Sequence, residues 1–276
     1  MKIRESAVAG RFYPASKEAL IGQLDSIMKK ELPNINLELI KNQIIGGVVP
    51  HAGYMFSAYQ AVHFFEILKQ SKQKFDTIVI VNPNHTGLGH EIAFDSSDYW
   101  ETPLGQVPLD VEFGESLGID ISDIEQKHEH SGEVMLPFLQ YFLDYNYQIA
   151  PITLSSQTFK NAKFLAERLH KSAKLLNRKI VLIASSDFSH FLSPEAGREK
   201  DAYVLENIIT LDSQAIEKVV HKKNISVCGY GPIMTLIEYA KLVGTNPKAE
   251  ILKIGHSGEI IPSSEVVNYV SILFSE

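Results

Sequence analysis

Three runs of apolar, mostly β-branched residues set the framework of this chain. Each run is long enough for one strand and shows no alternation with polar residues, which is typical of strands buried on both faces of a sheet. The runs cover residues 44–50, 77–83 and 179–186. Each ends where a polar or Gly-containing loop begins, so the sequence predicts three buried strands that are each followed by a loop.

Stretches with apolar residues at helical spacing separate these strands. They predict helices near residues 16–28, 57–68, 135–143, 159–176, 195–210, 213–220 and 232–242. Further short apolar runs predict strands at 91–94, 149–154, 250–254 and 266–274. Residues 96–110 show no clear period and contain Pro103, Gly105 and Pro108, so this segment is predicted to be a long loop that could fold over a site.

The alternation of strands and helices predicts an α/β fold. No linker-like stretch divides the chain, so we expect a single domain over residues 1–276. The last two apolar runs lack a helix between them, which predicts a mixed rather than a purely parallel sheet. The expected architecture is therefore a three-layer α/β/α sandwich with a mixed, largely parallel central sheet.

The polar residues that follow the three buried strands are candidates for chemistry. His51 follows the first strand, His85 the second, and Asp187 and His190 the third. In open α/β sheets, ligands bind beyond the carboxyl ends of the strands, so these side chains are expected to share one crevice. The structural alternative is that they cap neighbouring backbone groups.

Cys228, the single cysteine, is a further candidate. A free cysteine is often an inert core residue. Here it stands in a Gly-rich turn ahead of a predicted helix, where the helix N-terminus is expected to depress its pKa. One thiolate and two histidines would form a three-ligand set with open positions, which suits a catalytic metal better than a closed structural site.

Other polar residues near these positions are expected to support the candidate ligands or to take part in the chemistry. Asp187 and His190 are three residues apart, so in a helical turn they would face the same way, and the carboxylate would orient the imidazole as a general base. Asp187 as a helix N-cap is the alternative. Glu129 and His130 precede an apolar helix and are expected to contact a substrate or support the ligands. The histidines within predicted helices are expected to be structural: His63, His170 and His221.

Composition narrows the classes of function. Apolar residues make up 45% and charged residues 21% of the chain, which is ordinary for a globular protein with a sizeable core. The formal net charge is -7 and no block of Lys or Arg occurs, which argues against nucleic acid or an anionic membrane as partner. No apolar stretch has the length of a signal peptide or a membrane span, and one cysteine excludes an intrachain disulfide, so a cytoplasmic location is expected.

Seven short blocks, in this order, resemble the Memo family, whose fold is similar to that of the class III extradiol dioxygenases. The blocks lie at residues 7–14, 50–54, 83–87, 100–105, 129–131, 186–190 and 228–229. The resemblance implies a metal site formed by His51, His85 and Cys228, with Asp187 and His190 beside it.

The resemblance also bears on the metal. Ring-cleaving relatives use two histidines and a carboxylate, the open triad typical of non-haem iron. Cys228 stands at the third position here, and a thiolate favours softer ions, so iron(II) or copper(I) is expected and zinc also fits. Tyr54 and Trp100 lie in two of the blocks and are expected, like Glu129 and His130, to contact the substrate or support the ligands.

Three functions are compatible with these residues. The leading one is a metal-dependent oxygenase or oxidoreductase of unknown substrate, in which His190, oriented by Asp187, moves protons. The second is a metal-free hydrolase or transferase with Cys228 as nucleophile and His190 as base. The third is a non-catalytic protein that binds a peptide in the same crevice. The resemblance supports it, because a member of the Memo family is associated with a receptor phosphotyrosine motif. The negative net charge of this chain does not favour such an anionic ligand.

Overall fold

A nine-stranded sheet forms the centre of the computed structural model, which describes residues 1–276. Its strands are β2 (Ile44–Val49), β3 (Thr77–Pro83), β4 (Ile92–Phe94), β7 (Asp120–Ile121), β8 (Gln148–Leu154), β9 (Ile180–Ser185), β10 (His190–Leu192), β11 (Lys248–His256) and β12 (Val266–Ser275). The spatial order is β10-β12-β2-β9-β3-β8-β4-β7, and β11 also pairs with β12. Strands β2, β9, β3 and β8 are parallel, whereas β12 is antiparallel to β2 and β4 to β8. The predicted mixed, largely parallel sheet is confirmed.

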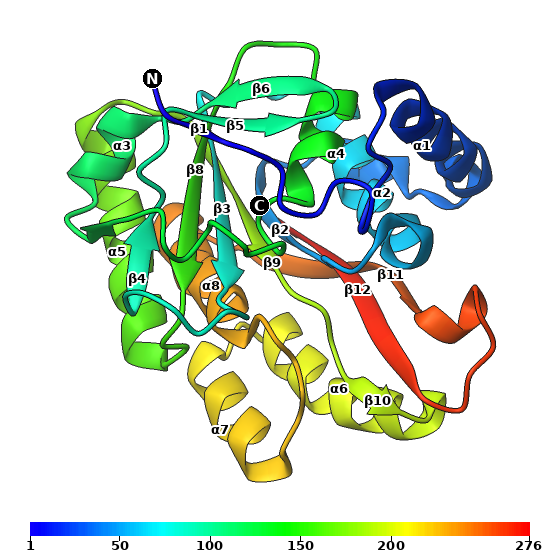
Figure 1. The fold of residues 1–276 in the computed structure, drawn as a ribbon. Helices are drawn as coiled ribbons and strands as arrows, with labels where there is room; N and C mark the ends of the chain where they lie inside the picture. Colours follow the sequence, from blue (N-terminus) through cyan, green and yellow to red (C-terminus); the bar gives the residue numbers. More distant parts are fainter.

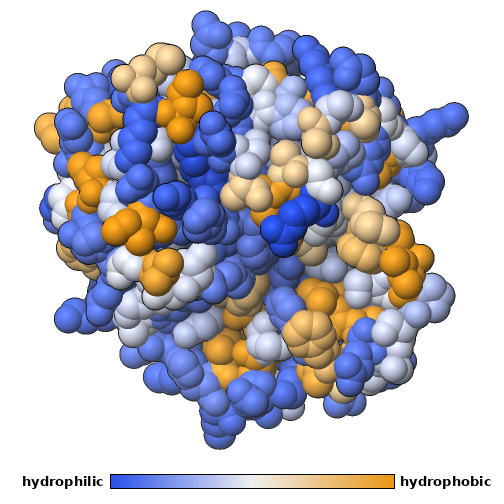
Figure 2. Space-filling view, viewed as in Figure 1, coloured by the Kyte–Doolittle hydropathy of each residue, from blue (hydrophilic) through white to orange (hydrophobic).

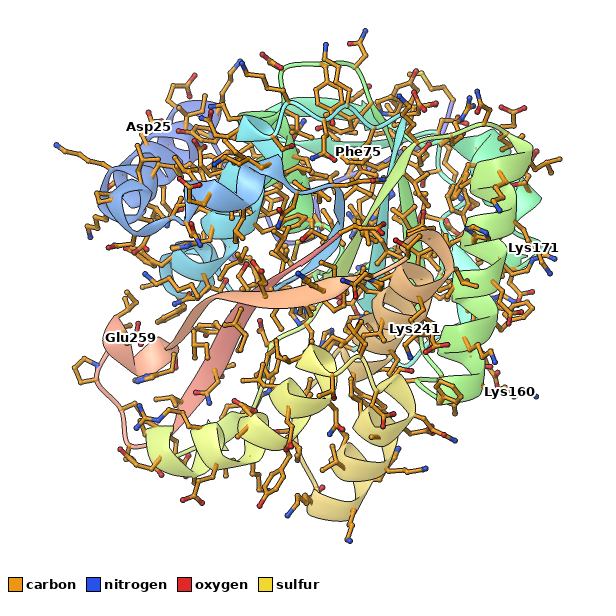
Figure 3. All side chains as sticks on the ribbon, turned by 180° about the vertical axis from the view of Figure 1, so that it is seen from behind. Asp25, Phe75, Lys160, Lys171, Lys241 and Glu259 are labelled. Carbon is orange, nitrogen blue, oxygen red and sulfur yellow. The ribbon has the colours of Figure 1, made fainter.

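Eight α-helices flank this sheet. They are α1 (Lys17–Glu31), α2 (Tyr54–Gln70), α3 (Val111–Ser116), α4 (Met135–Phe142), α5 (Phe159–Leu175), α6 (Pro194–Ile209), α7 (Ser213–Lys223) and α8 (Tyr230–Val243). On one face α2 packs against β2, β11 and β12, with α1 and α4 beside it; on the other, α8 packs against β2, β9 and β3, with α5 and α7 beside it (Figure 1). Seen from behind, Lys160 and Lys171 of α5 and Lys241 of α8 lie on the outer side of this second layer (Figure 3).

Polar caps define where several helices begin. Ser16, at the start of the first predicted helix, accepts a hydrogen bond from the Ala19 N–H. The helices α5, α6 and α7 begin in the same way, with an N-cap side chain that accepts a hydrogen bond from a backbone N–H of the first turn: Thr158, Ser193 and Asp212. Because an N-cap oxygen satisfies a backbone donor that the helix leaves free, these residues stop each helix from extending into the preceding loop.

The prediction of a long loop at residues 96–110 is wrong. This segment forms a hairpin of β5 (Tyr99–Thr102) and β6 (Gly105–Pro108), and β1 (Ile3–Arg4) adds to β5 to make a second, three-stranded sheet. Each strand has at most four residues, which is too short to show a period of two along the sequence. The turn between β5 and β6 ends at Gly105, whose φ of 118° is open mainly to glycine.

One cluster of 68 buried apolar residues forms the core on both faces of the main sheet. All residues of β2, β3 and β9 are buried, so these strands hold the loops that follow them in fixed positions. On the outside, Figure 2 shows apolar side chains in small separate groups among hydrophilic ones. No helix has both the length and the apolar character needed to cross a bilayer.

Candidate metal centre

Three segments that are distant in sequence bring their ligand atoms together at the carboxyl ends of β2 and β3. His51 follows β2, His85 follows β3, and Cys228 lies in the turn before α8. The ligand atoms of these three residues all lie within 4.8 Å of one another. The Cys228 Sγ is 3.1 Å from the His51 Nε2, and the two imidazole rings meet edge to face with centroids 5.2 Å apart. The structure therefore brings together the three side chains that the sequence singled out.

The hydrogen bonds of His51 point its free ring nitrogen at the thiol. The Ser185 hydroxyl donates to the Ser131 carbonyl oxygen at 2.7 Å, so it accepts from the His51 Nδ1, which is 2.8 Å away. The proton of His51 therefore sits on Nδ1 and the lone pair of Nε2 faces Cys228. Ser185, the last residue of β9, was not among the residues predicted from sequence, because nothing in the pattern separates it from its neighbour Ser186.

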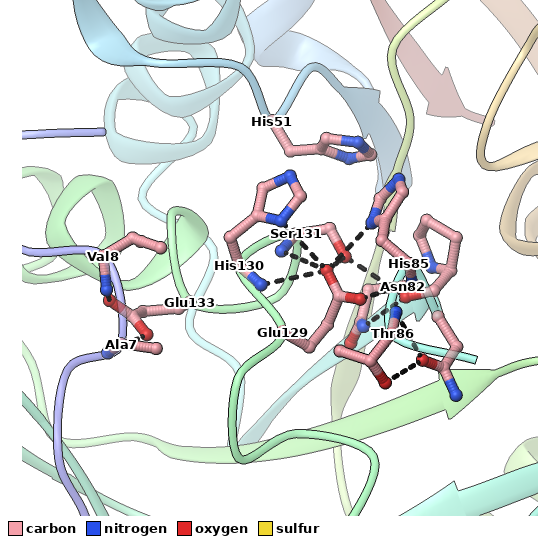
Figure 4. Close-up of polar contacts among 12 residues, drawn as sticks. Ala7, Val8, His51, Asn82, His85, Thr86, Glu129, His130, Ser131 and Glu133 are labelled. Carbon is pink, nitrogen blue, oxygen red and sulfur yellow. Dashed lines mark hydrogen bonds and ion pairs between the residues drawn. The ribbon is translucent and has the colours of Figure 1, made fainter. Parts of the chain in front are cut away.

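A buried carboxylate does the same for His85. The His85 Nδ1 is 2.9 Å from Glu129 Oε1, and the His85 backbone N–H donates to Oε2 of the same carboxylate at 2.5 Å (Figure 4). Since a carboxylate can only accept, the ring proton is on Nδ1 and the Nε2 lone pair is left for an ion. Burial lowers the pKa of His85, but the hydrogen bond and charge of Glu129 outweigh it and leave this pKa raised.

Glu129 is better described as a support for the imidazoles than as a ligand itself. His85, Glu129 and His130 also form a group with metal-ligand spacing. However, Oε1 of Glu129 already accepts from the backbone N–H groups of His130 and Ser131 and from the Ser131 hydroxyl, in addition to His85 (Figure 4). Burial raises the pKa of Glu129, yet His85 and these donors together lower it, so the carboxylate stays ionised without a metal.

His130 completes a group of three imidazoles. Its ring stacks on His85 with centroids 4.7 Å apart, meets His51 edge-on at 5.4 Å, and rests against Phe12 at 4.5 Å. Burial lowers its pKa to about 4 in spite of the neighbouring Glu129 charge. The expected position of Glu129 and His130 beside the ligands is thus what the structure shows.

The environment of Cys228 differs from the prediction. A depressed pKa was expected from the following helix N-terminus, but burial raises the pKa of the thiol well above its ordinary value, and the charge of Asp187 raises it further. Without an ion the thiol proton can be shared with the His51 Nε2, 3.1 Å away. A bound cation would replace this proton, because it supplies the positive charge that stabilises a thiolate.

Asp187 and His190 lie beside the cluster but do not form the expected pair. Asp187 Oδ1 accepts from the His51 backbone N–H at 2.8 Å, and burial raises the pKa of Asp187 to about 6. The His190 ring instead has its Nδ1 2.9 Å from the Ser226 carbonyl oxygen. The prediction that Asp187 orients His190 is wrong, because His190 begins β10, which pairs with β12, and the residues between the two do not form a helical turn.

Tyr54 and Trp100 are core residues rather than substrate contacts. Both are fully buried. The Tyr54 hydroxyl donates to the Val134 carbonyl oxygen at 2.7 Å and its ring stacks on Phe138. Trp100 lies in β5 beneath the guanidinium group of Arg4. Two roles were expected for these rings, substrate contact or support of the ligands. Their burial leaves no surface for a substrate, which excludes the first role, and the second stays a prediction.

Solvent reaches the cluster from one side. The His51 side chain is 2% exposed, whereas that of His85 is 36% exposed and that of His130 is 22% exposed. An ion held by the three ligands would therefore be anchored on the buried His51 and the half-buried Cys228 and open toward the His85 side. This arrangement leaves coordination positions for a further molecule.

The histidines predicted to be structural include one clear case. The His63 ring is buried in α2 and its Nε2 is 3.0 Å from Glu31 Oε2. One pair was missed: His90 binds Glu125 as His85 binds Glu129, with its backbone N–H 2.5 Å and its Nδ1 2.7 Å from Glu125 Oε1. The two pairs repeat along the same loop, but His90 is outside the group of ligand atoms.

Comparison with known proteins supports the resemblance noted from the motifs. A family model described as Memo-like protein matches residues 4–273. A MEMO1 family protein of Methanococcoides burtonii is 37% identical over 98% of this chain and 99% of its own length. A MEMO1 family protein of Saccharolobus solfataricus is 39% identical over the same shares of the two chains.

A solved structure shares the fold at much lower identity. An uncharacterized protein from Escherichia coli K12 superimposes with a TM-score of 0.53 at 13% identity, covering 77% of this chain and 91% of that one. This likeness concerns the arrangement of the strands and helices alone.

Proposed function

The chain belongs to the Memo-like protein family, and on this premise we propose that it binds a metal ion through His51, His85 and Cys228 and acts as an oxygenase or oxidoreductase. The observation that carries the proposal is that hydrogen bonds already fix the protonation and orientation of both imidazoles. Ser185 and Glu129 hold the ring protons on Nδ1, so both Nε2 lone pairs are free, and one ring nitrogen of each histidine lies within 4.8 Å of the Cys228 sulfur. Such support of ligating histidines is typical of metal sites.

The donor set favours a particular group of ions. Two imidazoles and one thiolate suit iron(II), copper(I) or zinc rather than magnesium or calcium, which prefer oxygen ligands. Three protein ligands leave positions open, as in catalytic rather than structural sites. Iron(II) or copper(I) held there would supply one-electron redox chemistry and an open coordination position.

Residues around the ligands are suited to hold and move protons. The Nδ1 of His190 is bound to the Ser226 carbonyl oxygen, so its Nε2 is free to accept a proton. The pKa of Asp187, raised by burial to about 6, lets this carboxyl exchange a proton near neutral pH. We assign the proton-transfer role to these two residues acting separately, with His130 lining the same opening.

The geometry does not favour the metal-free hydrolase. That function needs a thiolate, but burial raises the pKa of Cys228. It also needs His190 as base, whereas the imidazole nearest the sulfur is His51. Asp187 binds the backbone of His51 and not its Nδ1, so the usual order of nucleophile, base and orienting carboxylate is absent.

Oxygen consumption tests the proposed activity. Protein loaded anaerobically with iron(II) or copper(I) is mixed with reductants and a panel of phenolic substrates, and oxygen uptake is followed after air is admitted. We expect uptake that depends on both the loaded ion and Cys228, so that Cys228→Ser shows none while His63→Gln is unaffected. Uptake equal in loaded and unloaded protein, or no uptake with any partner, would count against an oxygenase or oxidase.

A further inference from the structure

Arg4 is a buried arginine on the short edge strand β1, and each of its three guanidinium nitrogens donates a hydrogen bond. Its Nε donates to the Gln126 carbonyl oxygen at 2.8 Å, its Nη2 to that of Glu129 at 2.7 Å, and its Nη1 to Glu133 Oε2 at 2.8 Å. The group also lies over the Trp100 ring, 4.2 Å from the centroid. Because the planar guanidinium has a rigid fork of donors, these contacts fix three points of the segment 126–133 relative to β1.

Glu133 ties the same segment to the residues that follow β1. Its carboxylate is fully buried. Besides Arg4, it accepts from the backbone N–H of Ala7 at 2.8 Å and of Val8 at 3.1 Å (Figure 4), and from the Tyr13 hydroxyl at 2.6 Å. The N-terminal arm, defined here as residues 3–13, is thus attached to both ends of this segment.

The segment held in this way carries the supports of both ligand imidazoles. Glu129 orients His85, and the carbonyl oxygen of Ser131 receives the Ser185 hydroxyl that orients His51. We propose that the N-terminal arm is a positioning element of the metal centre, with Arg4 as the positioning residue that sets Glu129 and thereby the His85 ring. The proposal rests on the proposed function, since the position that it maintains is that of a metal ligand.

A purely structural role makes a different prediction. If Arg4 only anchors the arm, its removal lowers stability but leaves the ligand rings in place, like the removal of any other arginine paired with a buried carboxylate. Arg178 is a suitable control. It pairs with Asp110 at 3.0 Å and with Glu112 at 2.9 Å and precedes β9, so it lies at the opposite end of the strands from the ligands.

The experiment compares Arg4→Ala with Arg178→Ala in the full chain. The first readout is Co²⁺ affinity by absorption titration, where the sulfur-to-cobalt charge-transfer band reports binding at Cys228. The second is the NMR signal of the His85 Nδ1–H in ion-free protein, which persists only while Glu129 accepts from it. We expect Arg4→Ala to weaken Co²⁺ binding about tenfold or more and to lose the signal, while Arg178→Ala changes neither.

Chemical rescue separates positioning from general damage. A cavity of about 340 Å³ is lined in part by residues 2–7, which include Arg4, and by the acidic Asp95 and Asp123, so the guanidinium cation can reach the space that Arg4 leaves. Added guanidinium is expected to restore affinity and signal in Arg4→Ala, and equal sodium chloride is not. Should Arg4→Ala fail to fold, Arg4→Lys is used, whose single ammonium cannot reach all three acceptors and is expected to weaken binding in the same direction.

Separate outcomes test the two proposals. Wild-type affinity and an intact His85 signal in Arg4→Ala or Arg4→Lys would overturn the positioning role, as would equal losses in Arg178→Ala. Wild-type protein that binds no Co²⁺ would overturn the proposed metal site, and the His85 signal would still decide whether Arg4 positions the ring.

Discussion

Replacement of Glu129 by glutamine tests how the site is assembled. The change keeps the size of the side chain but removes its charge and turns one acceptor oxygen into a donor. In the protein, Oε1 accepts from His85 Nδ1, from the backbone N–H of His130 and from the N–H and hydroxyl of Ser131, and Oε2 accepts from the His85 N–H. Glutamine therefore leaves at least one buried donor facing its NH2 group.

The expected size of the effect follows from these contacts. Hydrogen bonds to a charged group contribute about 1.5–3 kcal/mol each, and a buried donor without an acceptor costs about 1–3 kcal/mol, so we expect the free energy of unfolding to fall by about 2–4 kcal/mol. Loss of the group that orients a ligating histidine weakens metal binding by about 10- to 100-fold. Both effects are expected in Glu129→Gln.

Glu125→Gln provides the matched control. Glu125 holds His90 on the same loop through the same two kinds of contact, yet His90 is not among the ligand atoms. Isothermal titration with Co²⁺ and urea unfolding of ion-free protein give the two quantities. Glu125→Gln is expected to lose stability but to keep wild-type affinity; wild-type affinity in Glu129→Gln, or equal losses of affinity in both variants, would refute the reasoning.

The stability difference between wild type and Glu129→Gln should depend on pH. The pKa of Glu129 is lowered in the folded state, because the His85 bond and other donors outweigh burial, so its contribution is present above its ordinary value of 4.5 and is lost as pH falls through the lowered pKa. The pKa of His85 is raised, so its contribution is complete below its ordinary value of 6.5 and is lost as pH rises through the raised pKa. We expect the largest difference between these two values, and a difference that grows above pH 6.5 would contradict this linkage.

Three further substitutions have distinct expected results. Ser185→Ala removes the acceptor of the His51 Nδ1 and should weaken Co²⁺ binding about tenfold in the same titration; unchanged affinity would argue that Ser185 does not set the His51 ring. Phe191→Gly should raise the free energy of unfolding by about 1 kcal/mol, because Phe191 is 73% exposed and adopts a φ of 56°, which is strained for a side chain with Cβ; a loss of stability in urea would contradict this. His63→Gln should lower stability through its contact with Glu31 but leave metal content unchanged, as elemental analysis can show.

The positions of the candidate ligands were predictable where each follows a long buried strand. The runs of β2, β3 and β9 are unmistakable, and the rule that ligands gather at the carboxyl ends of strands then places His51 and His85 together. Cys228 was identified as a candidate from its motif and from the Gly-rich turn in which it stands. For these residues, a local pattern and a general property of α/β sheets were sufficient.

Other features depend on contacts that no local pattern encodes. The hairpin of β5 and β6 has strands of four residues and is stabilised by the addition of β1 from the far end of the sequence. The thiol of Cys228 is governed by burial and by Asp187 rather than by the helix that follows it. The partner of His190 is a backbone carbonyl group, which carries no signature in the sequence. Such tertiary contacts override the local expectation.

The metal content of protein purified without chelators tests the central claim most directly. Wild type, Cys228→Ser and His63→Gln are compared by elemental analysis at equal protein concentration. We expect an equimolar amount of iron, copper or zinc in wild type and in His63→Gln, and its loss in Cys228→Ser. Metal retained in full by Cys228→Ser, or absent from wild type even after anaerobic loading, would contradict a metal site formed by His51, His85 and Cys228.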